Sequence, residues 1–361
     1  MSFNISFSGK NYTIDQFIEI DKADLPKWAI SSQKFLKKWK KGETEFTQKT
    51  SGSTGKPKKL FIEKEQMIVS AQNTIEALTL KSGAKVLHCI SSDYIGGKML
   101  WVRALLGNWN VHLLKPKGHF NVKKLWPHYD FSAMVPLQVS NTLKDQDAQE
   151  VLNKFDQIII GGAAVSKGLE NQLQSIKATC YSTFGMTETI SHIALKQLNG
   201  PSRTKYFTLV GDNEISLDNR GCLMVRGKIT HNEWIQTNDL IVVKPNGFEW
   251  VGRFDLVVNT GGIKINLEEV EASLQSILQV ENHSFILWKQ PDDLLGERLI
   301  GISESKVFIN HLRENADQII KQLPKYHFPK RWLLCSEIKM TESGKVDRIS
   351  TANEILEEFN F

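Results

Sequence analysis

The chain has 361 residues, enough for one large domain and a smaller one but too many for a single compact core. Its 41% hydrophobic and 24% charged residues are typical of a soluble globular protein, and no stretch approaches the roughly 18 apolar residues of a membrane span. The net charge of +5 suits anionic small molecules such as nucleotides; it does not require nucleic acid, and we expect no such partner.

The N-terminal sequence predicts folded β-structure and not a signal peptide. Apolar residues alternate over Phe3–Phe7 and return at Tyr12 after a Ser-Gly-Lys-Asn sequence, which predicts a strand, a turn and a second strand. A basic start followed by a long apolar run, as in a signal peptide, is absent.

The cysteines give a second indication of the compartment. They are far apart and form no CxxC pair: Cys89, Cys180, Cys222 and Cys335. This spacing argues against a zinc site or a disulfide framework, and it predicts reduced thiols and a cytoplasmic location.

The segment Trp28–Lys41 has helical periodicity, with Trp28, Phe35, Leu36 and Trp39 on one face and lysines around it. Such a basic amphipathic helix can lie on a membrane. More often it is a surface helix that docks by its aromatic face, and we favour that interpretation.

Residues 60–250 mix strand-length and helix-length patterns. Apolar runs at Val86–Ile90, Val111–Leu114, Ala133–Val135 and Ile158–Ile160 predict strands, whereas other segments have helical periodicity: Glu65–Leu80 and Asp145–Phe155. We therefore expect an α/β fold of stacked sheets and covering helices in a large N-terminal domain, residues 1–253.

The pattern changes beyond Gly252-Arg-Phe-Asp255. A strand-like run, a glycine pair, an acidic helix start, a strand at Phe285–Leu287, a helix over Lys306–Lys321 and a strand at Arg331–Leu334 follow one another. This order fits a small α+β domain over residues 254–361.

The strongest local motif is Lys49-Thr-Ser-Gly-Ser-Thr-Gly-Lys-Pro-Lys58. Its hydroxyls, glycines and lysines can surround a polyphosphate. It is not a Walker A loop, because Pro57 follows Lys56 and the glycine spacing differs. A solvated turn would explain its glycines but not the adjacent lysines.

This loop resembles the signature loop of the adenylate-forming superfamily, which includes acyl- and aryl-CoA ligases. Further segments resemble the family's later motifs in the same order: Tyr181–Thr189, Trp234–Asp239, Gly252–Asp255 with Gly261-Gly262, and Lys339–Arg348. The resemblance spans residues 50 to 348. It implies a small mobile C-terminal domain, and it implies that ATP, Mg²⁺ and coenzyme A are the cofactors and substrates.

The resemblance also implies residue roles. The ATP-binding residues would be Thr50, Ser51, Gly52, Ser53, Thr54, Gly55, Lys58, Phe184, Gly185, Asp239 and Arg253. The residues acting in adenylation would be Lys345, Thr187 and Glu188, with Glu188 the magnesium ligand. Asp255 would be the hinge, and Gly261 and Gly262 the coenzyme A loop. Taken singly, each of these residues would more often be a cap, a turn or a surface charge.

Two departures from the family pattern stand out. Asn238 replaces the usual glycine before Asp239, which changes the local backbone but keeps the carboxylate. Only 49 residues precede the phosphate loop, fewer than the family norm, so we expect a shortened N-terminal domain.

Three stretches resemble the o-succinylbenzoate–CoA ligases of menaquinone biosynthesis: Ala133–Gln138, Ile158–Val165 and Gly185–His192. The implied acid carries a second carboxylate on its ring, which must stay charged and therefore needs a cationic or hydrogen-bonding partner. The candidate pocket residues are Tyr94, Lys98, Arg103, Gly161, Gly162 and His192. Tyr94 stands where the family commonly has histidine.

Other functions remain possible at this stage. The chain could be a CoA ligase for a different acid, an aryl-acid adenylating enzyme that loads a carrier protein, or a catalytically dead nucleotide-binding relative. Lys345, Glu188 and Asp239 together argue against the last. The sequence does not determine the oligomeric state.

Overall fold

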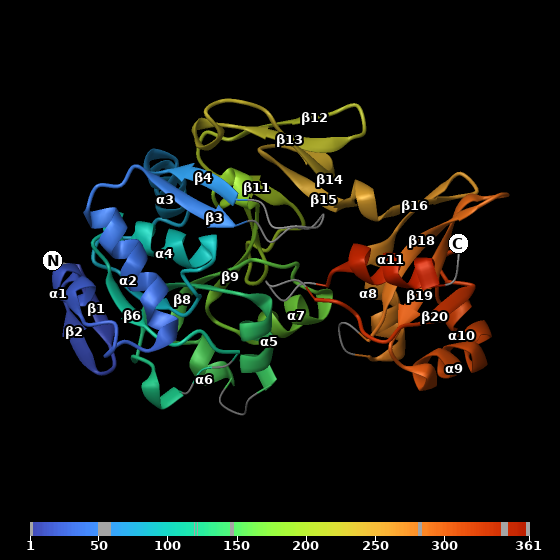
Figure 1. Cartoon of the computed structure of the whole chain (residues 1–361), viewed down its shortest axis with the longest axis horizontal. Helices are drawn as coiled ribbons and strands as arrows, with labels where there is room; N and C mark the ends of the chain where they lie inside the picture. The colour runs from blue at the N-terminus through green and yellow to red at the C-terminus, as the bar shows by residue number, and fades with distance from the viewer. Residues whose placement is uncertain are drawn as a thin grey trace.

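A computed structural model describes residues 3–49, 59–118, 120, 122–144, 148–280, 284–340 and 346–358. The molecule is elongated, with the N-terminus at one end of its long axis and a separate second sheet at the other (Figure 1). Among the described residues, no helix is both long and apolar enough to cross a bilayer.

The first sheet comprises β1 (Asn4–Phe7), β2 (Lys10–Tyr12), β5 (Lys85–His88), β6 (Asn110–Leu113), β7 (Tyr129–Met134), β8 (Phe155–Ile160), β9 (Thr179–Gly185), β10 (His192–Gln197), β11 (Phe207–Leu209), β12 (Glu214–Leu217), β13 (Cys222–Arg226), β14 (Ile235–Lys244) and β15 (Gly247–Arg253). Within the described residues, their order is β12-β13-β14-β15-β11-β10-β9-β8-β7-β5-β6-β1-β2. Strands β9, β8, β7, β5, β6 and β1 run parallel, and the others pair antiparallel.

The second sheet comprises β16 (Val257–Thr260), β17 (Ile263–Asn266), β18 (Ile286–Asp292), β19 (Gly296–Ser303) and β20 (Arg331–Leu334). Its order is β17-β16-β19-β18, with β20 pairing parallel to β19. A separate ribbon pairs β3 (Glu45–Lys49) with β4 (Lys59–Glu63).

The α-helices are α1 (Ile14–Glu19), α2 (Lys27–Lys40), α3 (Lys64–Ala77), α4 (Ile95–Leu106), α5 (Pro136–Lys144), α6 (Ala148–Leu152), α7 (Lys167–Gln172), α8 (Leu267–Leu278), α9 (Lys306–Glu314), α10 (Ala316–Ile320) and α11 (Arg348–Glu358). The 3₁₀ turns are η1 (Val122–Lys124), η2 (Leu173–Ser175), η3 (Thr187–Thr189), η4 (Lys228–Thr230) and η5 (Phe254–Leu256).

Helices cover both faces of the parallel strands, so consecutive strand residues enter different cores. On β5, Val86 joins the core with α2, α3 and α4, whereas Leu87 joins the core with α5, α6 and α7. On β8, Ile159 faces the first core, and Ile158 and Ile160 face the second. Burial on both faces explains why these strands read as continuous apolar runs. The expected α/β fold is confirmed.

Several predicted elements are found as expected. The first residues form the predicted strand, turn and strand as β1 and β2. The segment Trp28–Lys41 corresponds to α2, which buries Phe35 and Leu36 and keeps its lysines at the surface. All four cysteines are free thiols and buried.

Two predicted helices differ from the structure. In Asp145–Phe155 the helix α6 ends at Leu152, because Phe155 is buried as the first residue of β8 and pairs with Tyr129; residues 145–147 lie outside the description. The predicted helix Lys306–Lys321 is interrupted at Asn315. There the amide Nδ2 donates to the His311 carbonyl, a local bond that competes with helix continuation.

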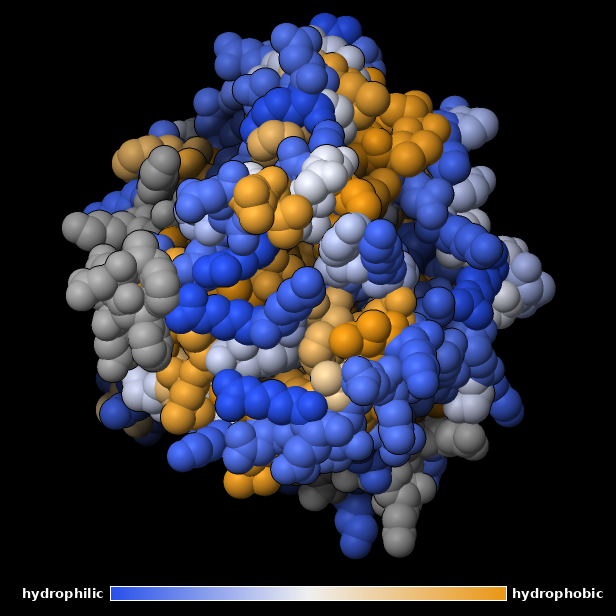
Figure 2. Space-filling model, turned by 90° about the vertical axis from the view of Figure 1, so that its right-hand side faces the viewer, coloured by the Kyte–Doolittle hydropathy of each residue, from blue (hydrophilic) through white to orange (hydrophobic). Residues whose placement is uncertain are grey.

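The second sheet has its own hydrophobic cores. Leu256, Val258, Val270 and Leu287 belong to one of them, and neither core shares a residue with those of the first sheet. The predicted division after residue 253 stays a prediction. Figure 2 looks onto this end of the molecule, where hydrophilic side chains surround separate hydrophobic patches.

Candidate active site

Several predicted site residues lie at the carboxyl edge of the parallel strands. Tyr94 is the N-cap of α4 shortly after β5, the Gly161-Gly162 turn follows β8, and Phe184 and Gly185 end β9. Ligands of open α/β sheets bind beyond this edge, where the strand order reverses. Here the order reverses at β5, since β6 lies on one side of it and β7 on the other. The fold therefore places these residues where a ligand is expected.

The predicted phosphate loop joins β3 to β4. Its candidate ligands Thr50, Ser51, Gly52, Ser53, Thr54, Gly55 and Lys58 lie outside the described residues. The two strands pair antiparallel up to the loop, with Lys49 opposite Lys59. The loop therefore starts and ends at one point of the ribbon.

Lys98 of α4 contacts the strand that leads into this loop. Its ammonium group donates to the Thr47 carbonyl at 3.1 Å and to Gln48 Oε1 at 2.7 Å. Gln48 Nε2 in turn donates to the Asp93 carbonyl at 3.1 Å. Burial lowers the pKa of Lys98 from its ordinary value. In this arrangement Lys98 ties α4 to β3, and its place in an acid pocket stays a prediction.

Two glycines of the edge permit close approaches of the backbone. A Cβ on Gly161 would lie 2.2 Å from Thr183 Oγ1, and one on Gly185 would lie 2.2 Å from the Ser191 carbonyl oxygen. Gly162 has a φ of +85°, in the left-handed region that favours glycine. Gly161 therefore lets the turn after β8 approach β9, and Gly185 lets the end of β9 approach the start of β10.

Phe184 packs edge-on against Phe207 and Phe248, with ring centroids 5.5 and 4.9 Å apart. These contacts fix the ring that is predicted to contact adenine. Thr187 and Glu188 follow on η3, and Glu188 is exposed and forms no ion pair with a described residue.

No cluster of three or more His, Cys, Asp or Glu side chains exists among the described residues. A magnesium ion that is bound mainly by substrate phosphates needs only one or two protein carboxylates. The exposed carboxylate of Glu188 at the strand edge fits that requirement.

Arg103 and His192 lie together in the core beneath this edge. Residue Arg103 is 1% exposed, and its guanidinium donates from one terminal nitrogen to Ser191 Oγ at 2.9 Å, but its Nε–H has no partner among the described residues. Burial lowers the pKa of Arg103 to about 9. Burial and, secondarily, Arg103 lower the pKa of His192 well below its ordinary value.

His192 is hydrogen-bonded through Nε2 to Thr74 Oγ1 at 3.1 Å, so α3 holds it in place. Its low pKa makes it neutral, and it cannot neutralise an acid. The cation of this cluster is Arg103, and no described carboxylate forms an ion pair with it.

Asp239 on β14 lies opposite Arg253 on β15. Its Oδ1 accepts a hydrogen bond from the Trp250 indole at 2.9 Å. Burial raises the pKa of Asp239, although the Trp250 and Arg253 side chains act in the opposite direction. The Arg253 guanidinium is engaged by both Asp255 oxygens, at 2.9 and 2.8 Å. The predicted ribose and hinge residues are therefore adjacent.

Trp250 is a neighbour of the site that sequence reasoning missed. Leu240 pairs with Gly252, and Ile241 pairs with Trp250, so Val251 is an extra residue between the two pairs. A β-bulge of this kind re-aims side chains, and no sequence pattern marks it.

The predicted coenzyme A loop is the tight turn between β16 and β17. Gly261 and Gly262 have φ of +55° and +82°, as a two-residue hairpin turn requires.

Lys345 lies outside the described residues. Next to it Met340 and Val346 form a bridge, and Arg348 on α11 pairs with buried Glu271 on α8 at 2.5 and 2.7 Å. Contacts are therefore described only for residues that flank positions 341–345.

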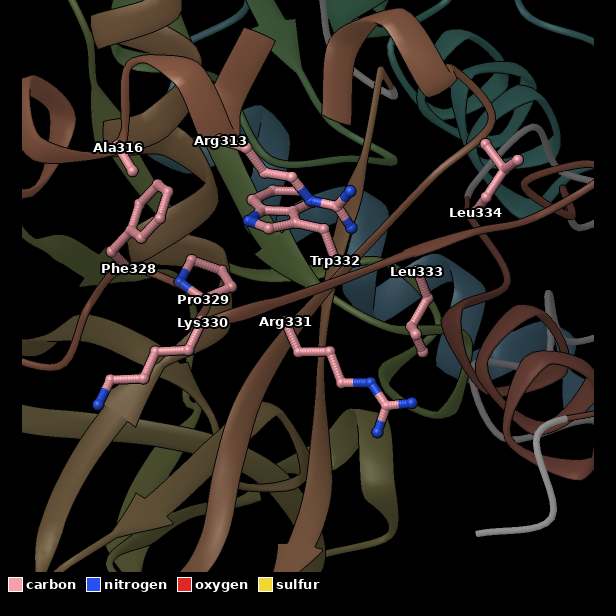
Figure 3. Close-up of a pocket in the computed structure, with 9 residues that line it drawn as sticks. All are labelled: Arg313, Ala316, Phe328, Pro329, Lys330, Arg331, Trp332, Leu333 and Leu334. Carbon is pink, nitrogen blue, oxygen red and sulfur yellow. The ribbon is translucent and has the colours of Figure 1, made fainter. Parts of the chain in front are cut away.

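A pocket of about 500 Å³ opens on the second-sheet end of the molecule. Figure 3 shows its lining residues, which come from α9, α10 and the segment that forms β20: Arg313, Ala316, Phe328, Pro329, Lys330, Arg331, Trp332, Leu333 and Leu334. Three of them are cations and none is acidic. The buried Trp332 Nε1–H has no hydrogen-bond partner among the described residues.

Comparison with known proteins identifies relatives along most of the chain. Residues 11–219 match the family model described as AMP-binding enzyme. A protein from Dyadobacter fermentans, described as an acyl-CoA synthetase (AMP-forming)/AMP-acid ligase II-like protein, is 31% identical, with a TM-score of 0.62. The match covers 94% of this chain and 97% of that one.

Other relatives are more distant. The 2-succinylbenzoate–CoA ligase of Listeria monocytogenes is 24% identical over 91% of this chain and 74% of its own length. The o-succinylbenzoate coenzyme A synthetase of Bacillus subtilis, solved with ATP and magnesium, has a TM-score of 0.69 at 19% identity, covering 85% of this chain and 69% of that one. At that identity the likeness concerns the fold alone.

Proposed function

The chain belongs to the family of AMP-binding enzymes, and we propose that it is an ATP-dependent acid–CoA ligase that acts on an acid with a second carboxylate, 2-succinylbenzoate. As an AMP-forming ligase it has two chemical steps. The carboxylate attacks the α-phosphorus of ATP and pyrophosphate leaves; the coenzyme A thiol, losing its proton, then attacks the acyl carbon and AMP leaves.

Each of these steps would use particular side chains of the candidate site. Asp239 would accept the ribose hydroxyls, Phe184 would contact adenine, and Thr187 would donate to the α-phosphate. Glu188 and the phosphates of ATP would hold Mg²⁺, which neutralises phosphate charge when bound. Lys345 would stabilise the charge that develops between carboxylate and phosphate.

The observation that carries the choice of acid is Arg103. A buried cation without an anionic partner destabilises the folded protein. Such a cation is useful when a bound ligand supplies the anionic group. Among the described residues the Arg103 Nε–H is unpaired. The Arg103 side chain is hydrogen-bonded to Ser191, which lies near the carboxyl edge of the parallel strands. A carboxylate can accept two parallel hydrogen bonds from one guanidinium. The second carboxylate of the acid would supply the missing partner.

Arg103→Met tests this assignment by AMP release with 2-succinylbenzoate and with 4-oxo-4-phenylbutanoate, which keeps the succinyl carboxylate but lacks the second carboxylate on the ring. We expect kcat/KM for 2-succinylbenzoate to fall by about 10- to 100-fold, the value of a hydrogen bond to a charged group, and the rate with 4-oxo-4-phenylbutanoate to stay constant. The unfolding temperature of the free protein should hold or rise, because an unpaired buried charge is removed. Equal losses with both acids would make Arg103 a structural residue.

The pocket of Figure 3 suits the phosphates of coenzyme A. Arg313 and Lys330 have no acidic partner among the described residues, and guanidinium groups bind phosphate bidentately. We expect Arg313→Gln to raise the KM for coenzyme A several-fold, with adenylate formation unchanged. The control is Lys306→Gln on the same helix, outside the pocket. A raised KM in both variants would indicate general surface charge and not a phosphate site.

A further inference from the structure

We infer that Arg220 is a positioning residue for the nucleotide, which holds the bulge of β14 that presents Asp239 and thereby sets the affinity for the ribose. This inference rests on the proposed placement of the ribose at Asp239.

Strand β14 departs from β13 at the residues that carry the carboxylate. Cys222 pairs with Leu240 and Met224 pairs with Gln236. Three residues of β14, numbers 237–239, therefore lie opposite the single residue 223 of β13. Such a bulge leaves backbone groups without ladder partners and re-aims the side chains on it. Asp239 still pairs with Arg253 of β15, but on the β13 side something other than the ladder must hold these residues.

The Arg220 side chain supplies those bonds. From the turn between β12 and β13, its guanidinium donates to the Thr237 carbonyl at 2.9 Å and to Asn238 Oδ1 at 2.9 Å. Asp218 orients the same guanidinium, with Nε to Oδ2 at 2.9 Å. The Asp218 carboxylate is itself held by the Cys222 backbone N–H at 2.9 Å. The planar guanidinium of Arg220 thus links the turn between β12 and β13 to both residues that precede Asp239.

The contact explains the departure at Asn238. Glycine, the residue usual at this place in the resembling motif, has no side-chain acceptor for the guanidinium. With asparagine, the backbone and the side chain of the bulge are both bonded to Arg220. In this chain the pair Arg220–Asn238 fixes a segment that pairing with β13 leaves unsupported.

The same guanidinium reaches the junction between the two sheets. Its central carbon lies 5.2 Å from the centre of the Phe254 ring, the first residue of η5. Phe254 follows Arg253, whose backbone pairs with Asp239. Arg220 therefore contacts the ribose strand and the start of the predicted hinge at once.

Strand β13 offers a matched control. Arg226 donates to Glu214 Oε2 at 3.1 and 2.7 Å, and its guanidinium lies 4.6 Å from the Trp234 ring centre. It has the same type of ion pair and ring contact as Arg220, but among the described residues it forms no hydrogen bond to residues 237–239. Arg226→Gln removes an equivalent surface arginine without touching the bulge.

The test measures the affinity of the full-length protein for AMP by titration calorimetry. We expect Arg220→Gln to weaken AMP binding by about tenfold, the effect of one lost hydrogen bond to a charged group, and Arg226→Gln to leave it unchanged. Asn238→Gly should weaken it less, and the double variant should not exceed Arg220→Gln, because both changes remove one network. Arg220→Lys, which keeps the charge but not the fork, should restore only part of the affinity.

A second ligand separates positioning from a general structural effect. 2′,3′-Dideoxy-AMP lacks both hydroxyls that Asp239 would accept, so Arg220→Gln and the wild type should bind it equally. Equal weakening for both nucleotides, or no weakening for AMP, would overturn the inference. Because the measurement needs neither acid nor coenzyme A, a failure of the proposed ligase activity would appear separately, as AMP binding without turnover.

Discussion

At the residue scale, Asp239 is a carboxylate whose environment opposes its charge. Burial raises its pKa, and the hydrogen bond from Trp250 and the charge of Arg253 only partly offset this effect. A carboxyl with a raised folded-state pKa costs stability at pH values above that pKa, where it must ionise, and the cost disappears as the pH falls through it. The folded protein therefore holds this charge at the expense of its own stability, as expected of a ligand-binding group.

Asp239→Asn should consequently separate affinity from stability. The amide cannot accept both ribose hydroxyls as an anion, so we expect the KM for ATP in pyrophosphate exchange to rise by about tenfold or more. The unfolding temperature at pH 7 should stay constant or increase, and the difference from wild type should shrink toward low pH. The control is Glu249→Gln, which breaks an exposed pair with Lys244. A lower unfolding temperature at pH 7 with an unchanged KM would make Asp239 a structural residue.

At the element scale, turns and bulges shape the site more than the strands do. The turn after β8 approaches β9 closely because Gly161 carries no Cβ, and the end of β9 approaches the start of β10 closely because Gly185 carries none. The sequence predicted a glycine turn after β8, and the close contact of Gly161 with Thr183 explains why the first residue of that turn is small. The bulges of β14 and β15 were not predicted, because a bulge changes register without changing the alternation of residue types.

The glycine turn between β16 and β17 allows a comparison with a second turn. Gly262 and Gly9 have nearly equal φ values, +82° and +78°, and a Cβ on either meets no atom within 4 Å. Alanine at each position should cost about 1–2 kcal/mol from the left-handed backbone alone. We expect similar falls in unfolding temperature, but slower thioester formation only for Gly262→Ala. If thioester formation is equally fast in both variants, the assignment of the coenzyme A loop is wrong.

At the scale of the whole molecule, one short segment joins the two sheets. Arg253 ends β15, Asp255 lies in η5, and their side chains pair with each other across this junction. Lys345 and the Gly261-Gly262 turn both belong to the part beyond it, and by resemblance they serve different steps at one site. We therefore predict that the second-sheet part rotates about Asp255 between the steps.

Asp255→Pro should block that rotation. Proline fixes φ near −65°, removes an N–H and disfavours the helical conformation of Phe254 before it. We expect adenylate formation to survive and transfer to coenzyme A to fail, the reverse of Lys345→Ala, which should abolish adenylation and spare transfer from a supplied adenylate. Asp255→Ala loses only the partly exposed ion pair and should run both steps. Wild-type rates in both steps for the proline variant would place the hinge elsewhere.

The sequence by itself determined the α/β class, the ordered motifs and the family, because apolar runs and motif spacing are local properties of the chain. It also placed the N-terminal hairpin and α2 correctly. It misjudged the helix over Lys306–Lys321, since the Asn315 side chain ends a helix that periodicity alone would continue. Only the tertiary structure decided which of the predicted polar residues are neighbours.

Those neighbours follow from contacts between distant segments, which no local pattern encodes. Lys98 is joined to β3, His192 to α3, and Arg103 to Ser191 with its Nε–H left unpaired among the described residues. Arg220 reaches β14 across a bulge that exists only once the strands are paired. The motifs therefore predicted the type of reaction and the residues involved. Burial and strand register decided which side chains contact one another and which charged groups are paired.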